Sequence, residues 1–450
     1  METLSYAEFS RRVHSQVVAE RVPINGSIEV TRRCPLECAH CYNNLPMSDR
    51  AARKRELTLD EHRRILDQIG AAGCLWLLYS GGEIFARKDF LDIYTHAKRQ
   101  GFIITLFTNG TLITPKIADH LAVWRPFAIE ITLYGHTRET YERLTGIPGS
   151  HARCRRGIEL LLERGLPLKL KTVAVSINRH EIWDMQRFAA GLGVEFKFDS
   201  LINPRIDCSQ SPLAVRLQPE EVVELDLQDP TRVDEYRALA ERVRAGAAAP
   251  PSDEVYHCGG GVHSFAIDPE GKLSICVLSH VDKYDLRQGS FADGWGSFLR
   301  KVRQKKISRP TKCVACRLKA ICGMCAANGE LENGDPEAPV DFLCQTAHLR
   351  AHTFRIPIAP HGDCEYCASG AGYQELLARL SKLRRAAADF SGAKPAGGAF
   401  LPLARPPAPM GAGCHSGGCS ACGAAAAPAE SAVQDRNLRV SADSAWSVPA

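Results

Sequence analysis

Six short apolar runs alternate with amphipathic stretches over residues 27–202, and this alternation restricts the fold more than any other feature. The runs are rich in β-branched and aromatic residues: SIEVT (27–31), LWLLYS (75–80), FIITLFTN (102–109), FAIEITLY (127–134), LKLKTVAVSI (168–177) and VEFKFDSLI (194–202). Such runs are typical of strands that are covered on both faces. Strand–helix alternation predicts a parallel sheet with right-handed crossovers. Six units are fewer than the eight of a closed barrel, so we expect an α/β fold, either a partial barrel or a doubly wound sheet.

The first amphipathic stretch carries the signal of a helix start. Thr58 stands three residues before Glu61, which is the spacing of a capping box. Four apolar residues fall on one side of the predicted helix: Leu59, Ile65, Leu66 and Ile69. We expect that side to pack on the sheet.

Length and composition limit the protein class. The chain has 450 residues, a net charge of +5 and 18 cysteines. It contains no run of about 18 apolar residues and no apolar segment of a signal peptide, so neither a membrane partner nor export is expected. The small net charge gives no indication of a nucleic-acid partner. Many reduced thiols in a long chain without an export signal indicate metal or redox work, which we expect in the cytoplasm.

The same patterns divide the chain into six segments. A length of 450 residues is enough for about three modules. The expected segments are an N-terminal extension (1–26), the barrel (27–210), a helical linker (211–257), a small Cys-rich iron–sulfur domain (258–345), a segment with a cysteine pair and a helix (346–394), and a low-complexity tail (395–450). The tail is predicted to be disordered because it is dominated by Gly, Ala, Ser and Pro.

The segment CPLECAHC follows the first predicted strand and places Cys34, Cys38 and Cys41 in a C-x3-C-x2-C spacing. Three thiolates at one strand end can hold three irons of a [4Fe–4S] cube and leave the fourth iron open to a substrate. The alternative is a zinc site with a fourth ligand such as His40.

The next predicted strand ends in Ser80, Gly81, Gly82 and Glu83. Ligands of parallel α/β sheets bind beyond the carboxyl ends of the strands, so these residues should lie at the same edge as the cysteines. Glycines let a backbone approach a ligand closely, and a carboxylate can bind an ammonium group.

Seven further cysteines stand between residues 258 and 344. They are Cys258, Cys276, Cys313, Cys316, Cys322, Cys325 and Cys344. The five residues between the two C-x2-C pairs of the middle run are few for a zinc ribbon. Seven cysteines divide naturally into four and three, which suits one closed and one open iron–sulfur cluster.

The CPLECAHC and SGGE segments and the six βα repeats resemble the radical SAM superfamily. In that family the open iron of a [4Fe–4S] cluster chelates S-adenosylmethionine (SAM), one electron cleaves SAM, and the resulting 5′-deoxyadenosyl radical abstracts a hydrogen atom from the substrate. The resemblance implies that Cys34, Cys38 and Cys41 hold this catalytic cluster inside a partial (β/α)6 barrel. It also implies contacts to SAM from Tyr42, Ser80, Gly81, Gly82, Glu83, Asn109 and Thr132.

The second cysteine group resembles the SPASM extension that follows many radical SAM barrels. By this resemblance Cys313, Cys316, Cys322 and Cys344 hold one auxiliary [4Fe–4S] cluster. A second auxiliary cluster with an open position would be held by Cys258, Cys276 and Cys325. The chain departs from the usual pattern in one place, because two residues rather than three separate Cys322 from Cys325.

The resemblance implies a substrate class less firmly than a chemistry. We expect modification of a ribosomally made peptide or a protein side chain by cross-linking or oxidation. The alternatives are a small-molecule pathway of a tetrapyrrole- or quinone-type cofactor and, outside enzymes, a zinc-binding interaction protein. Expected partners are the peptide or small-molecule substrate and a flavodoxin- or ferredoxin-type electron donor. Since only about 26 residues precede the first predicted strand, no N-terminal peptide-recognition domain is expected, which favours the small-molecule alternative or a separate peptide-recognition protein.

Five cysteines near the C-terminus have no assigned role. Cys364 and Cys367 with His361 suit a metal or redox pair. Three interpretations are possible for Cys414, Cys419 and Cys422. They are incidental thiols of a disordered tail, ligands of a metal or cluster, or part of a peptide-like segment that mimics or serves as a substrate.

Overall fold

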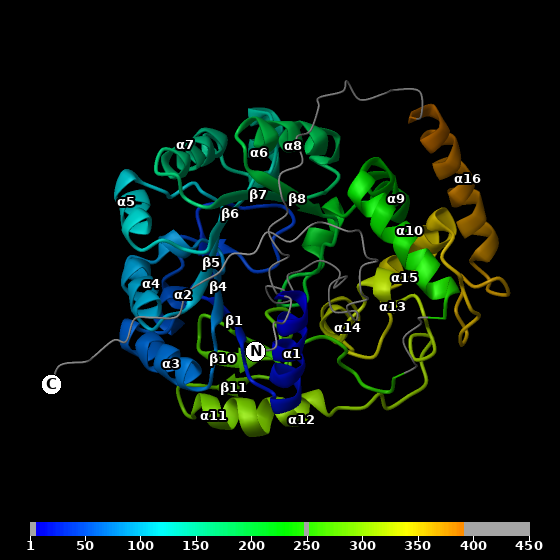
Figure 1. Ribbon diagram of the computed structural model, residues 1–450. Coiled ribbons are helices and arrows are strands. Elements are labelled where there is room, and N and C mark those ends of the chain that lie inside the picture. Colours follow the sequence, from blue (N-terminus) through cyan, green and yellow to red (C-terminus); the bar gives the residue numbers. More distant parts are fainter. Residues whose placement is uncertain (1–5, 247–251, 391–450) are drawn as a thin grey trace.

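The computed structural model describes residues 6–246 and 252–390 and is built around one nine-stranded sheet (Figure 1). The strand order is β11-β10-β9-β1-β4-β5-β6-β7-β8. The strands are β1 (Asn25–Glu29), β4 (Trp76–Ser80), β5 (Ile103–Thr108), β6 (Ala128–Thr132), β7 (Leu168–Val173), β8 (Glu195–Asp199), β9 (Ser264–Ile267), β10 (Lys272–Ser274) and β11 (Tyr284–Asp285).

The six strands predicted from the apolar runs are confirmed as β1, β4, β5, β6, β7 and β8, which pair in parallel in this order. The helices between them are α2 (Arg50–Arg55), α3 (Leu59–Ala71), α4 (Phe90–Arg99), α5 (Pro115–Val123), α6 (Arg138–Thr145), α7 (Ser150–Leu162) and α8 (Ile182–Gly191). Figure 1 shows α3 to α8 in an arc outside the strands. The predicted α/β fold is therefore confirmed as a barrel-like arrangement that stays open.

The start of α3 follows its sequence signal. The Thr58 side chain accepts a hydrogen bond from the Glu61 backbone at 3.2 Å, and Glu61 accepts one from the Thr58 backbone at 2.7 Å. Ile65, Leu66 and Ile69 are fully buried against the sheet. The capping box fixes where the helix begins, and burial of its apolar side fixes how it packs.

The sheet continues beyond β1 into the Cys-rich part of the chain. β9 pairs in parallel with β1, with Ile28 beside Ile267, and β10 and β11 add two antiparallel strands. Phe265, Ile267 and Leu273 belong to the same hydrophobic core as the barrel strands. The sheet thus crosses residue 258, where the sequence suggested a boundary.

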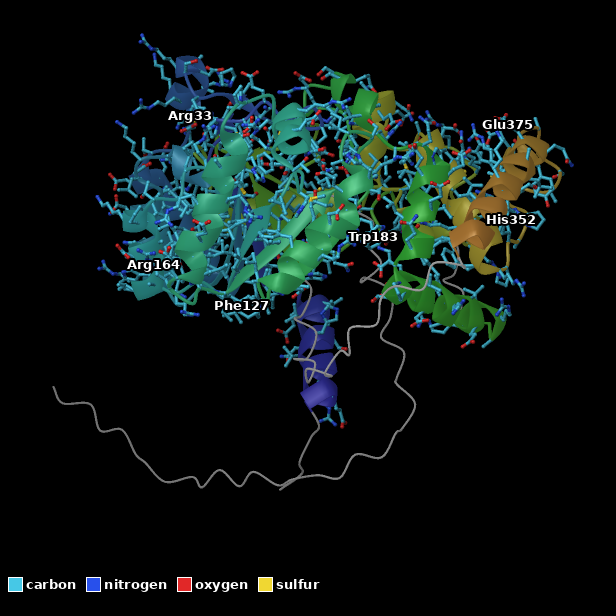
Figure 2. The ribbon with its side chains drawn as sticks, turned by 90° about the horizontal axis from the view of Figure 1, so that it is seen from above. Arg33, Phe127, Arg164, Trp183, His352 and Glu375 are labelled. Atoms are coloured by element: carbon cyan, nitrogen blue, oxygen red, sulfur yellow. The ribbon has the colours of Figure 1, made fainter. Side chains whose placement is uncertain are left out.

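Helices form a second body beside β8. They are α9 (Pro219–Gln228), α10 (Pro230–Arg244), α13 (Lys319–Cys322), α14 (Ala326–Asn333), α15 (Asp341–Phe354) and α16 (Tyr373–Phe390). The buried carboxylate of Asp226 on α9 binds Arg232 of α10 and Arg350 of α15, each at 2.7 Å. Figure 2 shows Arg164 of the barrel and Glu375 of α16 at opposite ends of the molecule.

The remaining elements are short or peripheral: α1 (Tyr6–Glu20), β2 (Arg33–Cys34), β3 (Leu45–Pro46), η1 (Ile84–Ala86), η2 (Arg179–Glu181), η3 (Ser211–Val215), α11 (Phe291–Asp293), η4 (Gly294–Leu299) and α12 (Arg300–Arg303). No helix within residues 6–246 and 252–390 is both long and apolar enough to cross a membrane. The predicted tail, with Cys414, Cys419 and Cys422, lies outside the described residues.

Candidate functional site

The loop with the first three cysteines stands at the carboxyl end of β1, as expected from its position in the sequence. Short strands β2 and β3 pair at its base and close it. Cys34 and Cys38 are buried, and Cys41 is partly buried. Burial raises the pKa of all three thiols, and Cys41 and Cys34 raise that of Cys38 further. Three crowded thiols of this kind are costly to ionise unless a bound cation compensates their charge.

Two arginines fix the loop. Arg33, next to Cys34, forms a buried ion pair with Glu56 at 2.8 Å and 2.9 Å. Arg205, from the segment after β8, donates to the carbonyls of Cys41 and Asn44 at 3.2 Å and 2.7 Å. The loop that carries the thiols is thus fixed by Glu56, which precedes β4, and by Arg205, which follows β8.

The two glycines after β4 allow a close approach of two backbones. The Gly82 backbone donates to the Thr31 carbonyl at 2.7 Å. A Cβ atom on Gly81 would lie 2.2 Å from that same oxygen, and one on Gly82 would lie 2.4 Å from the Arg32 carbonyl oxygen. Gly81 also has a φ of 132°, a backbone conformation that residues other than glycine rarely adopt. The glycines therefore let this segment lie directly against the chain that leads into Cys34.

Glu83 connects the ends of β4 and β5. Its buried carboxylate accepts from the Thr108 hydroxyl at 2.7 Å and from the Asn109 backbone at 2.8 Å. Burial raises its pKa to about 7. The Asn109 side chain in turn donates to Cys34 Sγ at 3.4 Å. Glu83, Asn109 and Cys34 thus form one connected group, and the carboxylate of Glu83 is directed at the protein rather than into open space.

Two further expected SAM contacts, Tyr42 and Thr132, lie directly after Cys41 and at the end of β6. Tyr42 donates to the buried Glu29 at 2.5 Å and packs beside Cys276 and Cys325. Thr132 ends β6 and is partly buried.

His40 packs against an aromatic ring. Its ring lies 5.5 Å from that of Tyr134, which packs beside the three thiols. Burial lowers the pKa of His40 to about 4, so the imidazole is neutral.

Cys258, Cys276 and Cys325 come together from three separate segments. Cys276 follows β10, and Cys325 directly precedes α14. The three thiols are close enough for Cys325 and Cys258 to raise the pKa of Cys276, after the larger effect of burial. Cys208, which the sequence pattern did not single out, packs in the same cluster and has its Sγ 3.4 Å from His280 Nε2.

The other four cysteines of the second group line one small cavity between α13 and α15. These are Cys313, Cys316, Cys322 and Cys344. Gly323 explains how neighbouring cysteines reach different groups, because its φ of 73° ends α13 and turns the chain. Cys322 then faces this cavity while Cys325 joins Cys258 and Cys276. The two residues between Cys322 and Cys325 are therefore enough to place these two thiols in different groups.

A shared backbone contact marks all three thiol groups. In each, a thiol sulfur accepts from the backbone N–H two residues later: Leu36 to Cys34, Leu278 to Cys276 and Leu318 to Cys316, each at 3.4 Å. Such bonds stabilise thiolates and tune iron–sulfur clusters. A single metal ion requires ligand atoms that all lie close to one another. In the described part of the chain, one set of three or more His, Cys, Asp or Glu side chains has its ligand atoms within 4.8 Å of one another, and this set contains none of the ten cysteines. The ten thiols are thus spaced too widely for one zinc ion to bind three of them, and they suit the several irons of a cluster better.

Charged residues that sequence reasoning missed line the inner face of β6 to β8. Ile129 and Ile131 pack in the helix-covered core, so Glu130 between them faces the opposite side. Glu130 binds Lys171 at 3.3 Å and Lys197 at 3.0 Å. Burial lowers the pKa of Lys171 to about 7 against the effect of Glu130. The alternation of Lys with apolar residues in LKLKTV could have indicated this polar face.

The fold and the thiol groups define the class of the protein, and comparison with known families agrees. Residues 28–189 match the family model described as the radical SAM superfamily. Residues 28–189 of this enzyme are therefore a radical SAM domain, and domains of this kind work with a [4Fe–4S] cluster and SAM.

AdoMet-dependent heme synthases and PqqA peptide cyclases are among the relatives of this chain. It is 26% identical over 342 residues to an AdoMet-dependent heme synthase of Methanosarcina barkeri, covering 68% of this chain and 92% of that protein. It is 27% identical over 360 residues to a PqqA peptide cyclase of Rhodopseudomonas palustris, covering 74% and 90%. Among solved structures, Streptococcus suis SuiB bound to its precursor peptide SuiA superposes with a TM-score of 0.57 at 18% identity, covering 76% of this chain and 82% of SuiB. AdoMet-bound anSMEcpe gives 0.53 at 14%, covering 81% and 98%. These structures share the fold.

Proposed function

We propose that this enzyme uses SAM to abstract a hydrogen atom from a ribosomally made peptide or a protein side chain, and so cross-links or oxidises it. The observation that carries the proposal is the grouping of ten cysteines into sets of three, three and four, the first at the carboxyl end of β1. The named relatives support a peptide as the substrate, because peptide cyclases cover about three quarters of the chain.

Cys34, Cys38 and Cys41 would hold three irons of the catalytic cluster. When bound, this cluster supplies the electron that cleaves SAM. The backbone of residues 80–83 would orient the methionine end of SAM, and Glu83 would act as a positioning residue that fixes this backbone and Asn109. Tyr42 and Thr132 would border the nucleoside. Cys313, Cys316, Cys322 and Cys344 would hold one auxiliary cluster, and Cys258, Cys276 and Cys325 the other.

The inner barrel face would receive the substrate. Lys171 and Lys197 around Glu130 can bind a carboxylate, and Lys171 Nζ can hold or release a proton near neutral pH. The barrel wall would exclude water, which prevents side reactions of a radical. A tetrapyrrole also carries carboxylates, and heme synthases cover 68% of this chain. A tetrapyrrole-type substrate is therefore the second candidate.

Anaerobic reconstitution tests the chemistry. The wild-type protein should release 5′-deoxyadenosine from SAM after reduction, and a variant with Cys34, Cys38 and Cys41 replaced by Ala should release none while it keeps auxiliary iron. Cys74→Ala is the matched control, because Cys74 is buried beside the Ile24 carbonyl and is not assigned to a cluster. SAM cleavage by the triple variant would refute the assignment of Cys34, Cys38 and Cys41 to the catalytic cluster.

A second assay tests the substrate. The reduced enzyme is given SAM with either short peptides encoded beside its gene or a tetrapyrrole, and products are followed by mass spectrometry. Loss of two hydrogen atoms per bond from a peptide, coupled to 5′-deoxyadenosine release, supports the proposal. Conversion of the tetrapyrrole with unchanged peptides would replace it by the second candidate.

A further inference from the structure

Beyond the ten cysteines assigned to clusters, four buried side chains come together where α15 meets the following loop. His348 lies on α15, while His361, Cys364 and Cys367 lie in the loop before α16. One ligand atom from each lies within 4.8 Å of all the others, and all four side chains are at most 5% exposed. The C-x2-C pair and His361 stand out in the sequence. His348 lies 16 residues before Cys364, and only the fold brings it to the other three side chains.

The spacing of these atoms fits one tetrahedral ion. His348 Nε2 lies 3.5 Å from Cys364 Sγ and 3.9 Å from Cys367 Sγ. A tetrahedral Zn²⁺ with its usual bond lengths places a nitrogen and a sulfur ligand about 3.6 Å apart. Four ligands complete its coordination, and a set of two sulfurs and two nitrogens is typical of zinc.

A backbone carbonyl lies within hydrogen-bond distance of the ring of each histidine. His348 Nδ1 lies 2.8 Å from the Cys344 carbonyl oxygen, and His361 Nδ1 lies 2.8 Å from the Ala359 carbonyl oxygen. An N–H donated from Nδ1 to a backbone carbonyl leaves Nε2 unprotonated and fixes the ring. His348 thus presents Nε2 to both thiols, whereas the His361 nitrogen that lies 3.5 Å from Cys367 Sγ is Nδ1.

We propose that His348, His361, Cys364 and Cys367 form a closed, structural Zn²⁺ site. The site fastens the loop before α16 to α15, one helical turn after Cys344. Cys344 Sγ lies 4.0 Å from Cys364 Sγ, and His348 and His361 border the cavity of the four auxiliary thiols. The zinc site therefore braces the helix that presents Cys344. This inference does not depend on which substrate the enzyme modifies.

The test measures zinc and iron in the reconstituted, chelator-washed full chain. We expect about one zinc per chain in the wild type, and zinc X-ray absorption with two sulfur and two nitrogen neighbours at about 2.3 Å and 2.0–2.1 Å. Cys367→Ala and His348→Ala should lose the zinc and retain the first cluster. The control Cys154→Ala should keep both, since Cys154 is buried in the barrel core.

The spectrum of the wild type decides the outcome even if a variant fails to fold. Absence of stoichiometric zinc, or a zinc shell other than two sulfurs and two nitrogens, overturns the proposal. Zinc that survives intact in both variants also overturns it. Loss of SAM cleavage would concern the proposed function and leaves the zinc measurement unaffected.

Discussion

Gly82→Ala is the sharpest test of how the barrel supports the first cysteine loop. The added Cβ would lie 2.4 Å from the Arg32 carbonyl oxygen and 2.6 Å from that of Arg33. Both obstacles are backbone atoms, so no flexible side chain can move away. Unlike Gly81, Gly82 has no positive φ, so the variant isolates the steric effect.

The size of the effect follows from these distances. Real Cβ contacts shorter than 3.0 Å essentially do not occur, so the two segments must separate by at least 0.6 Å (3.0 − 2.4). The hydrogen bond from the Glu83 backbone to the Arg33 carbonyl is 3.0 Å long, and such a separation would lengthen it to about 3.6 Å, beyond a useful bond. Overpacking of this kind costs about 1–3 kcal/mol, which lowers the thermal midpoint of a domain of this size by about 2–12 °C.

The assay combines thermal unfolding with iron and SAM-cleavage measurements on the anaerobic protein. We expect a lower midpoint, less iron and slower 5′-deoxyadenosine release, because the displacement passes directly to Cys34. Gly191→Ala at the end of α8 is the matched control, since its Cβ would meet nothing within 4 Å. If Gly82→Ala matches this control in all three measurements, the close-approach argument is refuted.

Two further variants test the barrel face and the auxiliary groups. Because burial lowers the pKa of Lys171 to about 7, below the ordinary value of about 10.4, the unfolded chain binds the extra proton between these values and wild-type stability rises with pH from about 7 to 10. Lys171→Met should flatten this rise in thermal unfolding; an unchanged slope would contradict the pKa. Cys325→Ala and Cys344→Ala should each lose about four irons, from different auxiliary clusters, and still cleave SAM. Full iron content in either variant would remove that residue from its cluster.

The barrel strands could be predicted because their signal is local. Runs such as FIITLFTN place apolar residues against the helices whatever the rest of the chain does, and Thr58 with Glu61 marks a helix start within four residues. Strand β9 had no such signal. Its pairing with β1 joins Ile28 to Ile267 across more than 230 residues, and a register of this kind is decided by tertiary packing rather than by local sequence.

The candidate site shows the same division. The spacing of Cys34, Cys38 and Cys41 is visible in the sequence because all three ligands share one loop. His348 was missed because a histidine in the middle of a helix has no spacing relation to Cys364. The inner-face lysines were missed because alternating Lys and apolar residues were taken for strands buried on both faces, whereas Lys171 is fixed by Glu130 from the neighbouring strand.

The order of the thiol groups in space bears on what each auxiliary cluster does. Tyr42 directly follows Cys41 and packs with Cys276 and Cys325, so the three-thiol auxiliary group borders the first cysteine loop. Cys316 and Cys322 instead pack with α10 and α15 in a separate hydrophobic cluster. On the proposed assignment, the group with an open position would thus be the one beside the first cysteine loop, and the four-thiol group would be coordinatively closed. If the two groups hold clusters as proposed, this arrangement favours substrate contact for the three-thiol group and electron transfer for the four-thiol group.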